Sequence, residues 1–281
     1  MTRQYRKEDF MDFSDFYLFS DIDGTLGTVD GGIPGRNVRA ISRFVDNGGH
    51  FALCTGRWAM DIKHFTKDVA VNGICIINNG GAFYDYSTGK CFRFRTLPKQ
   101  ALEYLRSIIN EDDIFEVLAI TRSGYFRIMH AESAWMPNDE NLNCRIKKLE
   151  EVHSPQLRIV FSIRSSSAAE YLIYRWNSFD FPGVSFIRSS DTQIEMLPEG
   201  VNKGSALIEL CKEQGIPINR TYFIGDSYND KEIFQIAGLS ACVAETPVEL
   251  QGLCNYVLGA CMDGALADFI QILHNISVIS A

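Results

Sequence analysis

Two aspartates that lie two residues apart, Asp21 and Asp23, are the residues of this sequence best placed to do chemistry. They belong to the segment DIDGTL, which directly follows an apolar run at 16–20 that predicts a buried strand. In an open α/β sheet, ligands bind beyond the carboxyl ends of the strands. Both carboxylates can therefore point into such a crevice, although an Asx turn would by itself explain an Asp-Gly-Thr sequence.

Polar residues also follow two other predicted strands, at 50–54 and 73–77. The first strand ends in Thr55, Gly56 and Arg57, which place a hydroxyl and backbone N–H groups at the start of a helix, where an anion is favoured. An N-cap threonine would explain the same pattern. The second strand ends in NNGG at 78–81, which is either a turn or a loop that faces a substrate.

A strand predicted at 221–225 is followed by DSYND, which adds the carboxylates of Asp226 and Asp230. Asn229 or Ser227 could cap the next helix, so one of the polar groups has a structural explanation. Lys203 begins another predicted helix, where the macrodipole disfavours a cation. This lysine is therefore either solvated or paired with an anion.

The four carboxylates of Asp21, Asp23, Asp226 and Asp230 would carry a charge of −4 at one edge of the sheet. Without partners, some of them would take up protons. A divalent cation and Lys203 would bring the sum to −4 + 2 + 1 = −1. Oxygen ligands of this kind suit Mg²⁺, which keeps waters and shares a substrate phosphate. The residues therefore predict a metal-assisted phosphate site.

The elements around these residues alternate between short apolar strands and amphipathic helices, which is typical of a parallel α/β sheet. Helices are predicted at 35–47 and 203–214, next to the strands given above. Between about 84 and 188 the pattern changes. Strands at 115–120 and 125–130 follow each other without a helix and predict antiparallel pairing. Helices are predicted at 99–110 and 166–179, with a weaker helical signal near 141–151. This block therefore predicts an α+β domain inserted into an α/β core.

The composition excludes several classes of protein. The 281 residues are 46% hydrophobic and 22% charged, as in a globular protein, and the net charge of −8 argues against a general nucleic-acid binder. No apolar run reaches the length of a membrane helix, and the first residues lack the apolar region of a signal peptide, so we expect a cytoplasmic location. The eight cysteines are scattered and are expected to be free thiols.

The segments DIDGTL, TGR, the lysine of NKG and GDSYND resemble the four ordered signature motifs of the haloacid dehalogenase (HAD) superfamily. The insertion of the middle block between the second and third motifs resembles the class IIB cap of the Cof-type phosphatases. The resemblance implies a Rossmann-like core with a parallel sheet at 1–84 and 189–281. It also implies an α+β cap domain of type C2B at 85–188.

The resemblance implies catalytic roles for four residues. Asp21 would be the nucleophile and form an aspartyl-phosphate, and Asp23 would act as general acid and then as general base. Thr55 and Lys203 would hold the phosphoryl oxygens, and Lys203 would also neutralise Asp21. For Arg57, the sequence leaves open whether it balances these carboxylates or pairs with a surface acid.

The resemblance also implies how a metal and a substrate are held. Mg²⁺ would be bound by Asp21, the main-chain carbonyl of Asp23, and Asp226, with Asp230 as a ligand or as a group that orients the ligands. The substrate would contact Thr55, Gly56, Asn79, Lys203 and Asn229.

The expected function is therefore a Mg²⁺-dependent phosphatase that acts on small phosphorylated metabolites such as sugar phosphates, nucleotides or cofactor phosphates. One alternative is a sugar phosphomutase of the same fold, because related mutases share the Asp-x-Asp-Gly-Thr motif. Another is a non-enzymatic binding or regulatory protein of HAD-like shape, although such a protein would not need Asp23 beside Asp21. The sequence does not indicate the oligomeric state.

Overall fold

The computed structural model describes residues 12–28, 30–122, 124–129, 145–152 and 156–280. Its contacts divide the chain into two compact units. Unit 1 consists of Met1–Phe92 together with Lys203–Ala281, and unit 2 consists of Arg93–Asn202. The first unit is thus built from two segments that are separated in the sequence by the whole of the second.

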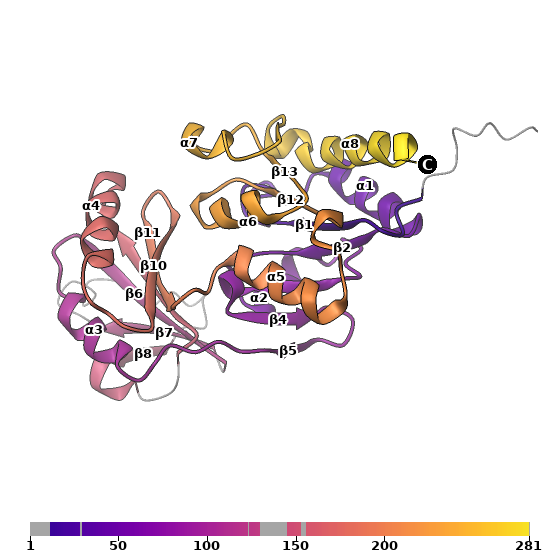
Figure 1. Ribbon diagram of the computed structural model, residues 1–281. Coiled ribbons are helices and arrows are strands. Elements are labelled where there is room, and N and C mark those ends of the chain that lie inside the picture. The colour runs from indigo at the N-terminus through magenta and orange to yellow at the C-terminus, as the bar shows by residue number, and fades with distance from the viewer. Residues whose placement is uncertain (1–11, 29, 123, 130–144, 153–155, 281) are drawn as a thin grey trace, which may run out of the picture. The chain divides into compact units, whose positions relative to one another are not determined.

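Unit 1 contains a five-stranded parallel sheet with the strand order β14-β13-β12-β1-β2 (Figure 1). The strands are β1 (Tyr17–Ser20), β2 (His50–Leu53), β12 (Thr221–Gly225), β13 (Leu239–Cys242) and β14 (Tyr256–Val257). β1 pairs in parallel with β2 on one side and with β12 on the other. Because all five strands run the same way, their carboxyl ends share one edge of the sheet.

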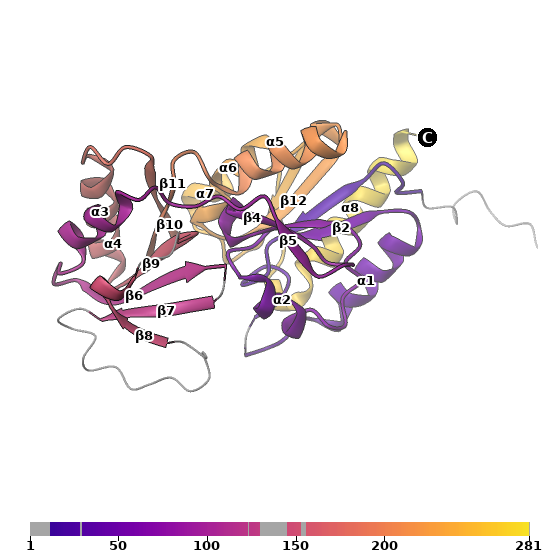
Figure 2. The ribbon, with the colours of Figure 1, turned by 90° about the horizontal axis from the view of Figure 1, so that it is seen from below.

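Helices cover both faces of this sheet (Figures 1 and 2). They are α1 (Gly35–Asp46), α2 (Ala59–Phe65), α5 (Lys203–Gln214), α6 (Lys231–Ile236), α7 (Val248–Gln251) and α8 (Ala265–Ser280). α1 packs against α8, and α5 packs against α6. In α1, Ile41 and Phe44 are fully buried because they recur on the helical face that meets the sheet. The predicted α/β architecture is confirmed.

The third predicted strand, β3 (Ile74–Ile77), is not a regular member of the parallel sheet. It contacts the strand before it through an isolated parallel bridge between Cys54 and Ile76. Its ladder partner is β4 (Ala82–Asp85), which the sequence analysis did not predict, and β4 pairs in turn with β5 (Lys90–Phe92). The chain reverses at Asn78 and Asn79, whose φ angles of 54° and 53° form a tight left-handed turn.

Unit 2 is built on a six-stranded sheet with the order β10-β11-β9-β6-β7-β8. Its strands are β6 (Ile114–Thr121), β7 (Gly124–Met129), β8 (Arg145–Lys148), β9 (Arg158–Ile163), β10 (Val184–Ser190) and β11 (Gln193–Pro198). All neighbours are antiparallel except β7 and β8. Helices α3 (Ala101–Ile108) and α4 (Ser166–Asn177) join this sheet in a core centred on Trp176, Phe161 and Phe186.

One expectation for this unit was wrong. The helical signal near 141–151 is contradicted at 145–148, where the chain forms β8 and pairs with β7, and at 149–151, where it forms a 3₁₀ turn. Residues 141–144 lie outside the described part of the chain. The two compact units divide at 92/93 and 202/203, whereas the sequence predicted a domain from 85 to 188. The boundaries differ because β5 pairs with β4 of unit 1, and β11 pairs with β9 and β10 of unit 2.

Two ion pairs are buried on the strands of this second sheet. The Arg158 guanidinium lies 2.5 Å from a carboxylate oxygen of Glu195, and the Arg127 guanidinium lies 2.8 Å from Glu116. Ser162 donates a further hydrogen bond to Glu116. Within the described residues, each of these two guanidinium groups thus faces a carboxylate. Among the described helices of both units, none is long and apolar enough to cross a membrane.

Candidate active site

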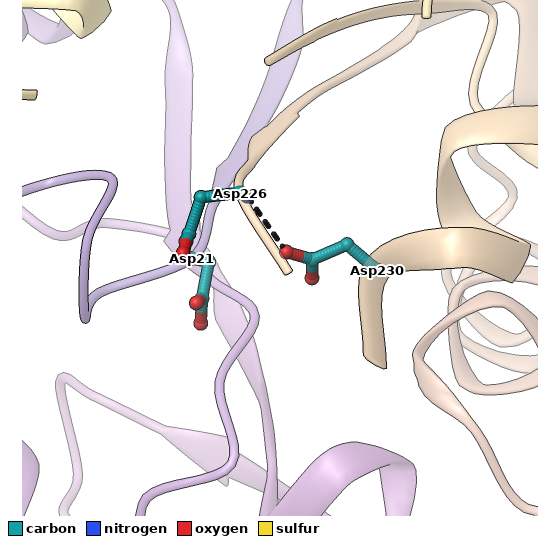
Figure 3. Close-up of side chains that lie close together, drawn as sticks. All are labelled: Asp21, Asp226 and Asp230. Atoms are coloured by element: carbon teal, nitrogen blue, oxygen red, sulfur yellow. Dashed lines mark hydrogen bonds between the residues drawn. The ribbon is translucent and has the colours of Figure 1, made fainter. Parts of the chain in front are cut away.

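Three carboxylates of unit 1 converge at the carboxyl edge of the parallel sheet. Asp21 follows β1, Asp226 follows the neighbouring β12, and Asp230 begins the next helical turn. One oxygen from each lies within 4.8 Å of the others. Figure 3 shows Asp21 beside Asp226, with Asp230 hydrogen-bonded to the main chain of Asp226. Pairing of the two strands in parallel register brings together residues that are about 200 positions apart in the sequence.

Two glycines make this approach of the carboxylates possible. Gly24 has a φ of +81°, and a Cβ atom added there would lie 2.6 Å from Oδ2 of Asp226. A Cβ on Gly225 would collide with Oδ2 of Asp230. The glycines of DIDGTL and of GDSYND are therefore required because any larger residue would occupy the space of a carboxylate.

Lys203 is the cation of this cluster. Its Nζ lies 3.0 Å from Oδ1 of Asp21 and 2.5 Å from Oδ1 of Asp230, and its side chain is fully buried. The sequence left open whether this lysine is solvated or paired, and the structure shows it paired. Burial by itself lowers the pKa of Lys203. The negative charges of Asp21 and Asp230 together raise it by more than burial lowers it, so the pKa lies above its ordinary value.

The carboxylate of Asp230 has both of its oxygens engaged. Oδ1 accepts the bond from Lys203, while Oδ2 accepts backbone N–H groups from Asp226 at 3.0 Å and Ser227 at 3.1 Å. Of the two roles that the sequence left open for Asp230, this geometry favours orienting its neighbours over direct binding of a metal.

The cluster contains more negative than positive charge, and the pKa values reflect this imbalance. Burial, and to a lesser extent Asp230 and Asp23, raise the pKa of Asp21 to about 7, although Lys203 opposes the shift. Burial, followed by Asp21 and Asp230, also raises the pKa of Asp226 well above its ordinary value. Added positive charge would favour the ionised form of both groups.

The carboxylate of Asp23 is separate from this cluster. Its side chain is 48% exposed and accepts two hydrogen bonds from Arg57, at 2.8 Å from Nε and 2.6 Å from Nη2. The guanidinium also lies over the ring of Phe65, with 4.5 Å between its central carbon and the ring centroid. Hydrogen bonding to Asp23 raises the pKa of Arg57, and this pair identifies the partner that the sequence left open for Arg57.

Four further predicted site residues lie at the ends of β2 and β3 and near β12. Thr55 is buried, and its Oγ1 accepts the backbone N–H of Arg57 at 3.1 Å. The backbone carbonyl of Thr55 accepts the N–H of Asn79 at 3.1 Å, and Oδ1 of Asn79 accepts a hydrogen bond from Asn229 at 3.0 Å. Gly56 directly follows Thr55 and is half-buried. The structure thus connects Thr55, Asn79 and Asn229 by hydrogen bonds.

Sequence reasoning missed one residue of the site. The hydroxyl of Thr25 donates a hydrogen bond of 2.6 Å to Oδ1 of Asp226 and is fully buried. The available signal was its place in DIDGTL, only two residues after Asp23. Thr25 fixes the orientation of a carboxylate that comes from the other segment of unit 1.

Comparison with known proteins identifies the family. The family of haloacid dehalogenase-like hydrolases matches residues 18–270, which is most of the chain. The chain belongs to this family. The predicted resemblance to Cof-type, class IIB members of the HAD superfamily is confirmed, as is the predicted enzyme class, a phosphatase.

Individual relatives of this HAD protein include two bacterial phosphatases. It is 28% identical to a Bacillus subtilis protein named 5-amino-6-(5-phospho-D-ribitylamino)uracil phosphatase, over 89% of this chain and 95% of the relative. It is 26% identical to an HMP-PP phosphatase of Yersinia enterocolitica, over 89% of this chain and 92% of the relative. The solved structure of a subclass IIB sugar phosphatase shares the fold, with a TM-score of 0.76, 14% identity and 92% and 98% of the two chains covered.

The donor set of this HAD protein fits a hard divalent cation. Carboxylate oxygens of Asp21 and Asp226 are of the type that Mg²⁺ prefers. One oxygen of each lies within 4.8 Å of the other and of Asp230. The excess of negative charge in a buried position is unfavourable unless a cation balances it. The site therefore has the ligand type and the charge that fit a divalent cation such as Mg²⁺.

Proposed function

We propose that the chain is a Mg²⁺-dependent phosphatase that hydrolyses phosphomonoesters of small metabolites through an aspartyl-phosphate on Asp21. The observation that carries this proposal is the buried cluster in which Lys203 lies 3.0 Å from Asp21, while Asp226 and Asp230 lie within 4.8 Å. A merely structural ion pair would need one carboxylate for one lysine. The additional carboxylates support a site for a cation and a phosphate.

The metal would be held by the carboxylates of Asp21 and Asp226 and by the main-chain carbonyl of Asp23. Thr25 and Asp230 would keep these ligands in place, because each is hydrogen-bonded to Asp226 or to its backbone. Bound Mg²⁺ would supply positive charge to the phosphoryl oxygens during transfer.

The protein's own residues would carry out the displacement. Lys203 holds Oδ1 of Asp21, which leaves the other carboxylate oxygen to attack phosphorus. Asp23 would donate a proton to the leaving oxygen and then accept one from the water that hydrolyses the aspartyl-phosphate. Because a protein contributes to phosphoryl transfer chiefly by positioning and by charge, these contacts would account for most of the catalysis.

Thr55, Gly56, Asn79 and Asn229 would bind the transferred phosphoryl group. Thr55 and Gly56 provide a hydroxyl and a backbone N–H at the end of β2, and Lys203 provides the ammonium. Asn79 and Asn229 support each other through their hydrogen bond of 3.0 Å and would form the opposite side of the phosphate site.

For the substrate, we propose a small phosphorylated metabolite. The related chains are named as phosphatases of a phosphoribitylamino-uracil and of HMP-PP, and a structural neighbour is a sugar phosphatase. We further propose that unit 2 is the substrate-selecting cap domain of type C2B. We infer a cytoplasmic location, which the free state of the seven described cysteines supports.

The test is a phosphate-release screen of the purified protein over many phosphorylated metabolites, with Mg²⁺ present. Steady release from at least one compound, without a bisphosphate activator, is the expected result. Isomerisation of a sugar phosphate without net release of phosphate would instead identify a mutase. No turnover across the whole panel would contradict the proposal and favour a binding protein.

A further inference from the structure

Unit 1 contains a cavity at the edge of the parallel sheet opposite the carboxylate cluster. It has a volume of about 250 Å³ and lies at the amino ends of β1, β2 and β3, where Tyr17, His50 and Ile74 begin these strands. Leu210 and Gln214, near the end of α5, form another wall. The catalytic residues follow the carboxyl ends of the same sheet, so the two sites lie at opposite edges.

Two small residues of the lining lie side by side on neighbouring strands. Ala52 on β2 and Gly73 just before β3 both line the cavity. A Cβ atom added to Gly73 would lie 3.0 Å from Cβ of Ala52, so the backbones approach each other closely at this point. Larger strand residues here would fill the hollow, as they do elsewhere in a close-packed interior.

One wall of the cavity is formed by stacked rings. Tyr17 and His50 are register partners on β1 and β2, and their rings stack with centroids 4.5 Å apart and planes at 7°. Phe19, the next residue on the same face of β1, adds a third ring to the lining. Flat aromatic surfaces of this kind favour a planar ligand that can stack or pack edge to face.

The polar groups at the rim offer hydrogen bonds without a fixed charge. The hydroxyl of Tyr17, the imidazole of His50 and the amide of Gln214 form no hydrogen bond with the described residues. Of the described residues that line the cavity, none is Lys, Arg, Asp or Glu. A charged ligand would therefore lose its hydration without gaining an opposite charge.

We propose that this cavity is a binding site for a small, uncharged, planar heteroaromatic molecule. A dry cavity of about 150 Å³ in a protein core is large enough for benzene. The volume of about 250 Å³ here suits a bicyclic ring system whose ring nitrogens reach the imidazole and the amide at the rim.

The first experiment measures binding of indole, benzimidazole and adenine to the full chain by saturation-transfer NMR. At least one should bind with a Kd of roughly 1 mM or tighter, as expected for ligands of about ten non-hydrogen atoms. Indole-3-acetate and tryptamine, which carry a charge, should bind at least about tenfold more weakly. Inorganic phosphate with Mg²⁺, which would occupy the catalytic site, should not displace the bound ring.

Substitutions in the lining of the cavity test whether the ligand binds there. Ala52→Val adds two methyl groups to the hollow and should weaken binding about tenfold or more. Gln214→Ala removes an exposed amide that could hydrogen-bond to the ligand, should leave the fold intact and should weaken binding about threefold. Gln235→Ala, at an exposed position on α6, is the matched control and should bind like the wild type.

Three results would overturn the inference. They are absence of binding by all three neutral compounds, binding that neither Ala52→Val nor Gln214→Ala alters, and equal binding of the charged compounds. The melting temperatures of Gln214→Ala and Gln235→Ala are measured as a control. Values equal to that of the wild type show that both variants are folded, so that a change in binding is not caused by unfolding.

Discussion

Both units bury charged side chains beside a sheet, but they balance these charges differently. In unit 2, Arg158 faces Glu195 and Arg127 faces Glu116, so each pair is neutral. In unit 1, the cluster of three carboxylates includes one lysine, which pairs with two of them, and burial raises the pKa of Asp21 to about 7. In a buried pair the two charges balance each other, whereas an unbalanced cluster remains unfavourable until a cation joins it. The balanced pairs of unit 2 are typical of a structural role, whereas the unbalanced cluster of unit 1 is typical of a site that binds a cation.

The largest effect is expected from removing the proposed nucleophile. Asp21→Asn should reduce kcat for phosphate release by about 10⁴-fold or more, because an amide does not form the acyl phosphate. Asp46→Asn makes the same change at the end of α1, away from the site, and should leave kcat unchanged. Turnover of Asp21→Asn close to that of the wild type would place the chemistry elsewhere.

Removal of the metal should have the next largest effect. EDTA should abolish phosphate release, and Mg²⁺ in excess should restore it. Mg²⁺ at about 100 times its Kd should also stabilise the folded protein by about 2.7 kcal/mol, which thermal unfolding detects. Asp226→Asn should lose most of this stabilisation. An equal Mg²⁺ effect on the variant and the wild type would show that the ion binds at another place.

Mutation of the buried ion pair of Arg158 and Glu195 should lower the free energy of unfolding. Glu195→Gln removes the carboxylate that faces the buried Arg158 and should cost about 3 kcal/mol in urea unfolding. Replacing both residues, as Arg158→Met with Glu195→Leu, should cost less than the single change, because no buried charge remains. If the double variant is less stable than Glu195→Gln, the ion pair stabilises the fold by more than the balance of its two charges explains.

The unbalanced cluster should make the metal-free protein sensitive to pH. The pKa of Asp21 rises from an ordinary 3.8 to about 7 on folding, so the folded state binds more protons than the unfolded chain between these values. The resulting stabilisation is complete below about pH 4 and is lost as the pH rises through about 7.

Urea unfolding in EDTA should therefore show a free energy of unfolding roughly 2 kcal/mol higher at pH 5 than at pH 7.5. Asp21→Asn should flatten this dependence, and Mg²⁺ should reduce it in the wild type. A wild-type stability that increases from pH 5 to pH 7.5 in EDTA would contradict the assignment.

The smallest effect is expected from the exposed pair of Arg57 and Asp23. Arg57→Met frees the Asp23 carboxylate from a fixed orientation and should lower kcat about tenfold for alkyl phosphates, which need a proton on the leaving oxygen. For p-nitrophenyl phosphate, whose leaving group needs no proton, kcat should change less than about threefold. Arg57→Lys should recover part of the loss. Equal losses on both substrates would show that Arg57 acts on the phosphoryl group instead.

Much of unit 1 could be predicted because its signals are local. Short apolar strands and amphipathic helices follow each other in the sequence, and parallel strands bring residues such as Asp21 and Asp226 to one edge. Strands β4, β8 and β11 were not predicted as such, because their conformation depends on partners that are not apparent from the segments themselves.

The site was predictable in its residue types but not in its contacts. The spacing identified Asp21 and Asp23 together, yet only the rotamers and neighbours show that Lys203 binds the first and Arg57 the second. Thr25 was missed because a hydroxyl in a Gly-Thr turn has many roles, and its partner Asp226 is supplied by a distant segment.

The division of unit 1 into two segments has a consequence for how the enzyme is made. On the ribosome, β1 emerges with β2 as a neighbour, but its other neighbour, β12, follows only about 200 residues later. Synthesis runs at roughly 5–20 residues per second, so the incomplete sheet has an unpaired inner edge for at least about ten seconds. Lys203, Asp226 and Asp230 all belong to this late segment, so a nascent chain has none of them before the inserted unit has been translated.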